Sequence, residues 1–393
     1  MNPSDTAPGP HSGPHSGPQS GPYSRAGAAI ALALASACAS PMPTASTHAP
    51  VTTAPFGTLK DGRQATAFTL RNSQGMVAVL TDFGATLVSL EMPDSEGRTA
   101  DVVLGFDDVS GYESDRNQYF GCIAGRVANR LKDARFELDG ELYELPANND
   151  PHTLHGGDVG FNGRLWDASK GGGAEVTFRY ESPSGEEGFP GALTTAVTYA
   201  LSDDGVLTLT YEATTDAPTI CNLTHHSYFN LGGHGSGPIA DHELMILADG
   251  VTACDDTMIP TGEIMNVTGT AFDFRKAKPI GTDLEKVIAT PALGYDHNFV
   301  LNTKSGKACA ELHDPRSGRT LQISTDQPGI QFYTGNFLFG QEGKDGQTYD
   351  IRSACCLETQ AFPAAPSHSH FPSIVLRPGE TYTQTTSHHF YNR

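Results

Sequence analysis

Four short stretches of the chain place ionisable side chains beside glycines and aromatic residues, a mixture suited to acid–base chemistry. Together they supply imidazole, carboxylate and guanidinium groups. Burial and neighbouring charges can bring the pKa values of an imidazole and a carboxylate close to neutral pH, so that one gives a proton while the other takes one. The stretches are GRVANRL (Gly125–Leu131), HTLHGG (His152–Gly157), THHSYFNLGG (Thr224–Gly233) and CLETQ (Cys356–Gln360).

Each of these residues also has a purely structural interpretation. Arg130 can form half of a salt bridge, His155 before two glycines can cap a turn, and Glu358 can be an exposed strand residue. On a strand, His225 and His226 would point to opposite faces, so at most one of them serves a given pocket. The occurrence of all four stretches in one chain favours a functional site, because chance does not readily explain the whole set.

Strands must position these groups, because an alternation of apolar and polar side chains dominates from about residue 55 onward. Hairpins are predicted around Asp139-Gly140, around Asp204-Gly205 and through residues 314–318. Helical periodicity is nearly absent, and only residues 282–289 are expected to form a turn or two of helix. Since the composition does not change after residue 60, the sequence predicts an all-β protein with one large β-sandwich domain over residues 55–393.

Composition excludes several classes of protein. The 393 residues include 25 basic and 45 acidic side chains, and the resulting net charge of −20 would repel the backbone of a nucleic acid. With 38% apolar and 18% charged residues the chain has a globular composition. The cysteines after residue 100 show no CxxC spacing, so neither an obligatory disulfide nor a cysteine zinc site is expected.

The N-terminal part divides into three segments. Residues 1–25 repeat Pro-His-Ser-Gly without aliphatic side chains and are predicted to be disordered. Residues 26–39 are apolar, too few to cross a bilayer, and typical of a signal peptide; residues 40–54 have the composition of a linker. Cys38 follows small residues, as in a bacterial lipoprotein box, so membrane attachment is expected only if Cys38 is lipidated. We expect export to the periplasm or outside the cell, whereas translation from Met42 would give a cytoplasmic protein.

Six stretches, in order along the chain, resemble those of the aldose 1-epimerases, the galactose mutarotase family. The resemblance extends from about Phe56 to LRPGETY (Leu376–Tyr382) and covers nearly all of the chain outside the N-terminal segment. It implies a β-supersandwich that interconverts the α and β anomers of free aldohexoses such as galactose and glucose, without a cofactor or a metal. The stretches are GRVANRL, HTLHGG, HHSYFNLGG, GYDHNFVL, PGIQFYTGNF and CLETQAFP.

The resemblance also assigns roles to individual residues. His226, directly before Ser227 in the His-Ser-Tyr-Phe-Asn-Leu motif, corresponds to the proton donor, and Glu358 in Leu-Glu-Thr-Gln corresponds to the proton acceptor. His225 stands where the family usually has asparagine. His155 is also expected to assist proton transfer at the ring oxygen of the sugar. The sugar-binding positions correspond to Asn129, Arg130, His155, Asp296 and Gln331.

Other interpretations remain open. A glycoside hydrolase usually needs two carboxylates, and Glu358 with Asp296 supplies such a pair. A non-catalytic sugar-binding protein would lack the acid or the base, and a sugar-phosphate epimerase would need more cations than Arg126 and Arg130. A metal site is suggested by three histidine pairs, but no cysteine or carboxylate completes a ligand set, and none is predicted. The histidine pairs are His152/His155, His368/His370 and His388/His389. Separately, three aromatic residues could either face a sugar or pack in the core: Phe229, Trp166 and Phe332.

Overall fold

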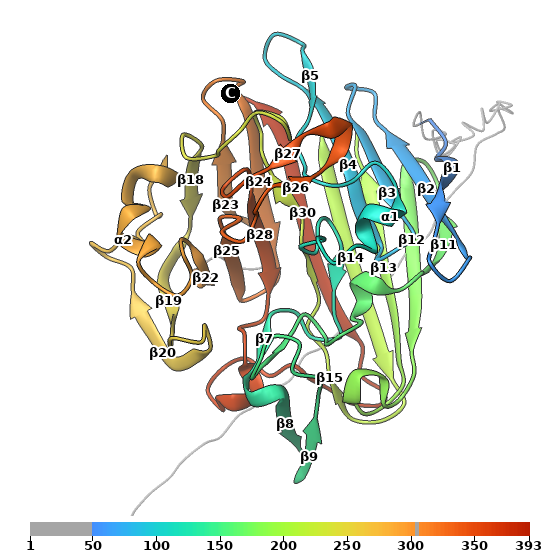
Figure 1. The fold of residues 1–393 in the computed structure, drawn as a ribbon, viewed down its shortest axis with the longest axis vertical. Helices are drawn as coiled ribbons and strands as arrows, with labels where there is room; N and C mark the ends of the chain where they lie inside the picture. The colour runs from blue at the N-terminus through green and yellow to red at the C-terminus, as the bar shows by residue number, and fades with distance from the viewer. Residues whose placement is uncertain (1–48, 303–305) are drawn as a thin grey trace, which may run out of the picture. The chain divides into compact units, whose positions relative to one another are not determined.

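The computed structural model describes residues 49–302 and 306–393, and their regular structure is almost entirely β-strand (Figure 1). The helices α1 (Val109–Tyr112) and α2 (Glu285–Ile288) are one turn each, so no helix within these ranges is long and apolar enough to cross a membrane. Short 3-10 turns connect the strands: η1 (Lys132–Ala134), η2 (Phe161–Gly163), η3 (Glu186–Gly188), η4 (Ile280–Asp283), η5 (Lys344–Gly346) and η6 (Ala365–Ser367).

Most of the predicted N-terminal features lie outside the described residues. These are the disordered segment 1–25, the apolar segment 26–39 with Cys38, and the linker up to residue 48. Strand β1 (Thr52–Thr58) begins inside the predicted linker, and the side chain of Val51 is buried in the main hydrophobic core. The predicted linker is therefore too long at its C-terminal end, because the chain already packs against the domain at residue 51.

A nine-stranded antiparallel sheet forms one layer of the fold (Figure 1). The C-terminal strand β30 lies in its middle and pairs with β14 on one side and β24 on the other. In order across the sheet, the strands are β11 (Asp167–Lys170), β12 (Glu175–Ser182), β13 (Leu193–Leu201), β14 (Val206–Thr215), β30 (Tyr382–Asn392), β24 (Arg319–Thr325), β23 (Lys307–His313), β18 (Glu243–Ile246) and β21 (Lys278–Pro279).

A six-stranded antiparallel sheet carries most of the C-terminal sequence stretches. Its strands β25 and β28 are buried along their whole length, since both of their faces are covered. In order across the sheet, the strands are β17 (Tyr228–Phe229), β28 (Cys355–Gln360), β25 (Gly329–Tyr333), β22 (Asp296–Leu301), β19 (Ala248–Cys254) and β20 (Pro260–Asn266).

The remaining strands form a five-stranded sheet and several two-stranded ribbons. The sheet is a meander of β1, β2 (Gln64–Arg71), β3 (Val77–Thr81), β4 (Thr86–Pro93) and β5 (Thr99–Asp101). The ribbons pair β6 (Ile123–Ala124) with β16 (Thr224–His225), β7 (Arg130–Leu131) with β10 (Thr153–Leu154), β8 (Arg135–Leu138) with β9 (Glu141–Glu144), β15 (Thr219–Ile220) with β29 (Val375–Leu376), and β26 (Gln341–Glu342) with β27 (Thr348–Tyr349).

The three predicted hairpins are present. Asp139 and Gly140 join β8 to β9, and both have the positive φ (53° and 83°) that a tight two-residue hairpin turn requires. Residues 202–205 connect β13 to β14, and residues 314–318 connect β23 to β24. The helical segment expected at 282–289 contains α2. The all-β sandwich predicted from the sequence is therefore confirmed.

The nine- and six-stranded sheets share the main hydrophobic core. Leu321 of β24 packs in the same cluster as Phe332 of β25 and Leu357 of β28. Successive side chains of a strand point to opposite faces, so the neighbouring residues Gln331 and Glu358 face away from this core. One face of the six-stranded sheet packs against the main hydrophobic core, and the opposite face carries polar side chains such as Gln331 and Glu358.

Candidate active site

A pocket lies on the polar face of the six-stranded sheet and contains six of the seven residues assigned from the sequence. Its empty volume, which includes space open to solvent, is about 440 Å³. Gln331 is absent from the lining, because it lies buried beside Asp296. The six predicted residues that line the pocket are Asn129, Arg130, His155, His226, Asp296 and Glu358.

Strand register brings residues distant in sequence to this pocket. Gln331 on β25 lies directly opposite Glu358 on β28, and Tyr333 lies opposite Asp296 on β22. All of them point to the same face, because residues two apart in a strand share a face. The carboxylates of Asp296 and Glu358 therefore enter one pocket from different strands.

The two adjacent histidines point to opposite sides, as predicted. The ring of His225 lies in the interior, near the rings of Tyr199 and His388, and its Nε2 lies 2.8 Å from the Ser227 hydroxyl. The ring of His226 faces the pocket instead, 5.0 Å from the ring of His155. His226 is therefore the histidine of this pair that the site uses.

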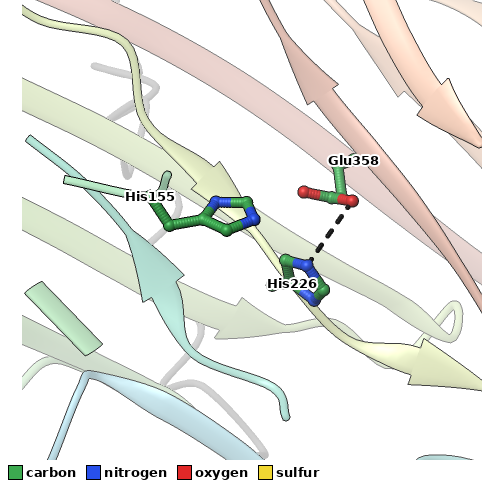
Figure 2. A group of neighbouring side chains, drawn as sticks. All are labelled: His155, His226 and Glu358. Atoms are coloured by element: carbon green, nitrogen blue, oxygen red, sulfur yellow. Dashed lines mark ion pairs between the residues drawn. The ribbon is translucent and has the colours of Figure 1, made fainter. Parts of the chain in front are cut away.

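His226 and Glu358 form the centre of the site (Figure 2). Nε2 of His226 lies 3.7 Å from Oε1 of Glu358, and the residues are only 4% and 2% exposed. Burial raises the pKa of Glu358 well above its ordinary value, and the nearby charge of Asp296 adds to this effect. Burial lowers the pKa of His226 to about 4. The short separation of the two side chains, the raised pKa of Glu358 and the lowered pKa of His226 suit a pair that exchanges protons.

A hydrogen bond from the backbone determines the tautomer of His155. The N–H of Asn129 donates to Nδ1 of His155 at 3.2 Å, so a neutral His155 carries its proton on Nε2. Burial, with His226 and Arg130 nearby, holds the pKa of His155 well below its ordinary value. Asn129 and His155 both have positive φ (61° and 49°), a strained backbone that tends to persist where function requires it. His155 is a neutral hydrogen-bond donor aimed into the pocket.

This tautomer also bears on metal binding. Potential ligand atoms of His155, His226 and Glu358 lie within 4.8 Å of one another (Figure 2). A metal ion bonds to a ring nitrogen that carries no proton, whereas the backbone bond to Nδ1 leaves the proton of His155 on Nε2. The donor set therefore fits a metal ion poorly. Three of the other histidines considered for a metal have partners elsewhere: His152 accepts from the N–H of Asp133, while His368 and His370 bond to backbone carbonyls.

A chain of polar contacts forms one wall of the pocket. Nε of Arg130 donates to Oδ1 of Asn149 at 3.1 Å, and Nη1 of Arg130 lies 3.7 Å from Oδ2 of Asp296. Nε2 of Gln331 donates to the other oxygen of Asp296 at 2.6 Å. The carboxylate is thus held between a guanidinium and an amide, and direct contact of Gln331 with a sugar, implied by the resemblance, stays a prediction.

Arg126 does not belong to the site. Its guanidinium is buried and donates to the carbonyls of Pro190 and Gly191 and, at 2.5 Å, to the hydroxyl of Ser182. Among the described residues that line the pocket, Arg130 is the one cation. This arrangement offers no cationic cluster for a phosphate group.

Comparison with known proteins agrees with the geometry. A family model described as aldose 1-epimerase matches residues 66–389. The chain belongs to the aldose 1-epimerase family. Galactose mutarotase from Bos taurus is 47% identical over 342 residues, which cover 86% of this chain and 97% of the relative. Aldose 1-epimerase from Escherichia coli (strain K12) is 38% identical over 335 residues, or 84% and 96% of the two chains.

Solved structures of aldose 1-epimerase relatives share the fold. An aldose epimerase homologue from C. elegans aligns with a TM-score of 0.77 at 38% identity, covering 82% of this chain and 98% of that one. Galactose 1-epimerase from Lactobacillus acidophilus aligns with the same TM-score at 28% identity, covering 87% and 98%. The supersandwich fold expected from the family resemblance is therefore confirmed.

For the aromatic residues considered near this aldose 1-epimerase site, the sequence favoured packing in the core over contact with a sugar, and the structure confirms this. Phe229, Phe332 and Trp166, the aromatic residues considered from the sequence, all lie in the main core. The aromatic rings that line the pocket are those of Tyr119, Tyr228, Tyr333 and Phe337. Alternation could have identified Tyr333, which must point away from the core if its neighbour Phe332 points into it. No comparable signal marks Tyr119.

Proposed function

We propose that this protein catalyses the interconversion of the α and β anomers of free aldohexoses such as galactose and glucose, with Glu358 as the base and His226 as the acid. The observation that carries the proposal is the buried pair itself, with Nε2 of His226 3.7 Å from Oε1 of Glu358 at a small-molecule pocket. The family membership and the 47%-identical relative named galactose mutarotase support the reaction and the sugar.

The reaction needs only proton transfers. The base removes the proton of the C1 hydroxyl while the acid protonates the ring oxygen, and the C1–O bond of the ring breaks to give the open-chain aldehyde. Rotation about the C1–C2 bond turns the other face of the carbonyl toward the hydroxyl, and closure with the reverse proton transfers gives the other anomer. One base and one acid suffice, without a covalent intermediate or a cofactor.

The protonation of the pair fits this cycle. The raised pKa of Glu358 and the lowered pKa of His226 place one shared proton on the carboxyl group of the unliganded protein. Transfer of that proton to His226 prepares the charged pair that opens the ring, and the total number of protons does not change. Ring opening then returns a proton to Glu358 and removes one from His226. The neutral pair of the resting protein therefore corresponds to the open-chain stage of the reaction.

The other polar groups of the pocket suit sugar hydroxyls. Nε2–H of His155 is a fixed donor, the Asp296 carboxylate is an acceptor, and the Arg130 guanidinium has donors left beyond its contacts with Asn149 and Asp296. Such contacts hold the ring in one orientation relative to the acid and the base. Arg130 is already partly neutralised by Asp296, which favours an uncharged sugar over a sugar phosphate.

Polarimetry on freshly dissolved α-D-glucose and α-D-galactose tests the proposal. We expect the protein to accelerate the approach to the anomeric equilibrium for both sugars, and to leave an aryl β-galactoside intact. No acceleration over the buffer by a folded protein, for either sugar, would rule out the epimerase. Release of the aryl group would instead favour a hydrolase that uses Glu358 and Asp296.

Gln331→Met is expected to raise KM about tenfold with little change in kcat, because Asp296 loses the 2.6 Å hydrogen bond that orients it while the acid and base stay in place. Steady-state mutarotation kinetics over a range of galactose concentrations measure both constants. Gln360→Met is a matched control, since Gln360 lies on the neighbouring strand and its amide has no partner among the described residues. A loss of kcat without a change in KM would place Gln331 in the proton transfer and contradict this role.

A further inference from the structure

Tyr119 lines the pocket with a backbone conformation that tyrosine seldom adopts. Its φ is 61°, in the left-handed region that favours glycine and asparagine. The centroid of its ring lies 4.6 Å from that of His155 and 5.7 Å from that of His226. A strained residue therefore places one aromatic ring beside both histidines of the site, and such strain tends to persist where function requires it.

The segment that carries Tyr119 is fixed to the rest of the fold. Phe120, the next residue, is fully buried in a second hydrophobic cluster. The N–H of Gly121 donates to the carbonyl of His226 at 3.0 Å, and the N–H of His226 donates to the carbonyl of Cys122 at 2.9 Å. The backbone just after Tyr119 is thus bonded to the backbone of the proposed acid, so the rings of Tyr119 and His226 keep a defined relation.

Tyr119 differs from the other two tyrosines of the pocket. Tyr228 and Tyr333 are only 2% and 7% exposed and pack in the second hydrophobic cluster, with their rings edge to face and the centroids 5.9 Å apart. The Tyr333 hydroxyl also accepts the N–H of Phe337 at 3.0 Å. Tyr119 is partly exposed, and its hydroxyl makes no hydrogen bond within the described ranges. Its ring and its hydroxyl are therefore both available to a ligand.

The chemistry of a phenol suits a free sugar. Burial raises the pKa of Tyr119 to about 12, so its hydroxyl keeps the proton at neutral pH and can both donate and accept. A sugar hydroxyl has the same two capacities, while the C–H groups on the face of a pyranose ring are apolar and suit the face of an aromatic ring. A bound sugar would give the Tyr119 hydroxyl the partner that no described residue supplies.

We propose that Tyr119 is a further sugar-binding residue, whose ring packs against a C–H face of the substrate and shields His155 and His226 from water, and whose hydroxyl bonds to a sugar hydroxyl. The proposal rests on the proposed aldose substrate. Shielding matters because water would otherwise compete for Nε2–H of His155, and orientation matters because the sugar must lie within reach of both His226 and Glu358. Glycine or asparagine would adopt this backbone more easily, so a tyrosine here points to a need for its side chain.

Two substitutions at Tyr119 in the full chain separate binding from folding. Tyr119→Phe removes only the hydroxyl, and we expect KM for galactose to rise about fivefold with kcat within about twofold of the wild type. Tyr119→Gly removes the ring and the backbone strain together. We expect it to raise KM about twentyfold and to lower kcat, while the midpoint of urea unfolding stays at or above the wild-type value. Polarimetry gives KM and kcat, and the signals of ¹⁵N-labelled histidine side chains during a titration give the equilibrium affinity for galactose.

Two matched controls lie outside the pocket. Met258→Gly makes the change to glycine at another left-handed residue, with a φ of 66°, in the turn between β19 and β20. Tyr143→Phe removes a hydroxyl that donates to Glu141 on the same strand, β9. Neither control should change KM, kcat or the affinity for galactose.

Wild-type KM and galactose affinity in both Tyr119 variants would overturn the proposal. So would a Tyr119→Gly variant that loses stability together with affinity while Tyr119→Phe matches the wild type, because that pattern indicates a structural role. The titration does not depend on turnover. A wild type that binds galactose without accelerating mutarotation would reject the proposed function, and the affinities of the variants would still decide the role of Tyr119; a wild type that binds no galactose would reject both.

Discussion

Glu358→Gln and His226→Asn are each expected to lower kcat for mutarotation by about 10²–10⁴-fold, the usual contribution of a general acid or base. Each substitution keeps the approximate size of the side chain and removes its ability to exchange a proton. Both positions are almost fully buried, and the two side chains face each other at 3.7 Å, so neither role passes to solvent easily. Polarimetry against the spontaneous rate in buffer measures the loss, with circular dichroism to confirm folding.

His225→Asn provides a matched control for the histidine. It makes the same substitution one residue earlier, at a side chain that contacts Tyr199 and His388 and not the pocket. The variant should keep kcat within about threefold of the wild type, since it changes a buried packing contact and not the proton transfer. If His226→Asn also kept its activity, the proton would have to come from another donor of the pocket, and His155, with its proton on Nε2, would be the first to test.

The double variant Glu358→Gln/His226→Asn separates a coupled pair from two independent groups. One transition state uses both proton transfers, so removal of either group should remove most of the benefit of the other. We expect the double variant to be about as slow as the slower single variant. Losses that multiply would instead indicate two groups acting at separate steps.

Strand alternation explains why part of the site could be predicted from the sequence. It places Glu358 on the face opposite Leu357, and it separates His225 from His226, which the structure confirms. Alternation alone does not show which face of a strand lines a pocket. For that reason both roles stayed open for Phe332, with the core favoured; Phe332 packs in the core, and its neighbour Tyr333 lines the pocket.

The features of the site that the sequence could not predict depend on contacts between segments that are distant in the chain. The hydrogen bond from Asn129 to His155 joins residues 26 positions apart and depends on a backbone with positive φ at both, which residue types alone do not reveal. Arg126 and Arg130 look alike in the GRVANRL stretch. Only the folded chain shows that Arg126 is enclosed by carbonyl oxygens and that Arg130 reaches Asp296.

Buried neutral histidines are expected to make the protein unstable in mild acid. Burial lowers the pKa values of His242, His297 and His388 from 6.5 to about 4, and it holds the pKa of His225 well below its ordinary value. The unfolded chain takes up protons below about pH 6.5, whereas the folded chain resists them until about pH 4. The free energy of unfolding therefore falls as the pH falls through this window.

The expected loss is large because several groups contribute to it. The difference between 6.5 and about 4 for His388 corresponds to about 3 kcal/mol by pH 4, at ~1.4 kcal/mol for each pH unit. Glu358 acts in the opposite direction, because its raised pKa lets the folded state take up a proton over part of the same range. Burial also raises the pKa of Asp82, which acts in the same direction as Glu358, but two carboxyl groups do not offset several histidines. Urea unfolding at pH 7.5, 6.5, 5.5 and 4.5 should show a midpoint that decreases steadily.

His388→Phe is expected to flatten this pH dependence. The His388 ring packs against Phe229 and His225, and its Nδ1 has no partner among the described residues, so a phenyl ring can replace it without breaking a hydrogen bond at that atom. His389→Phe is the matched control, because the next residue of β30 points to the more exposed side of the sheet. If both variants kept the wild-type slope between pH 6.5 and 4.5, protonation of the buried histidines would not be the cause of acid unfolding, and paired carboxylates such as Asp273 would be the groups to change next.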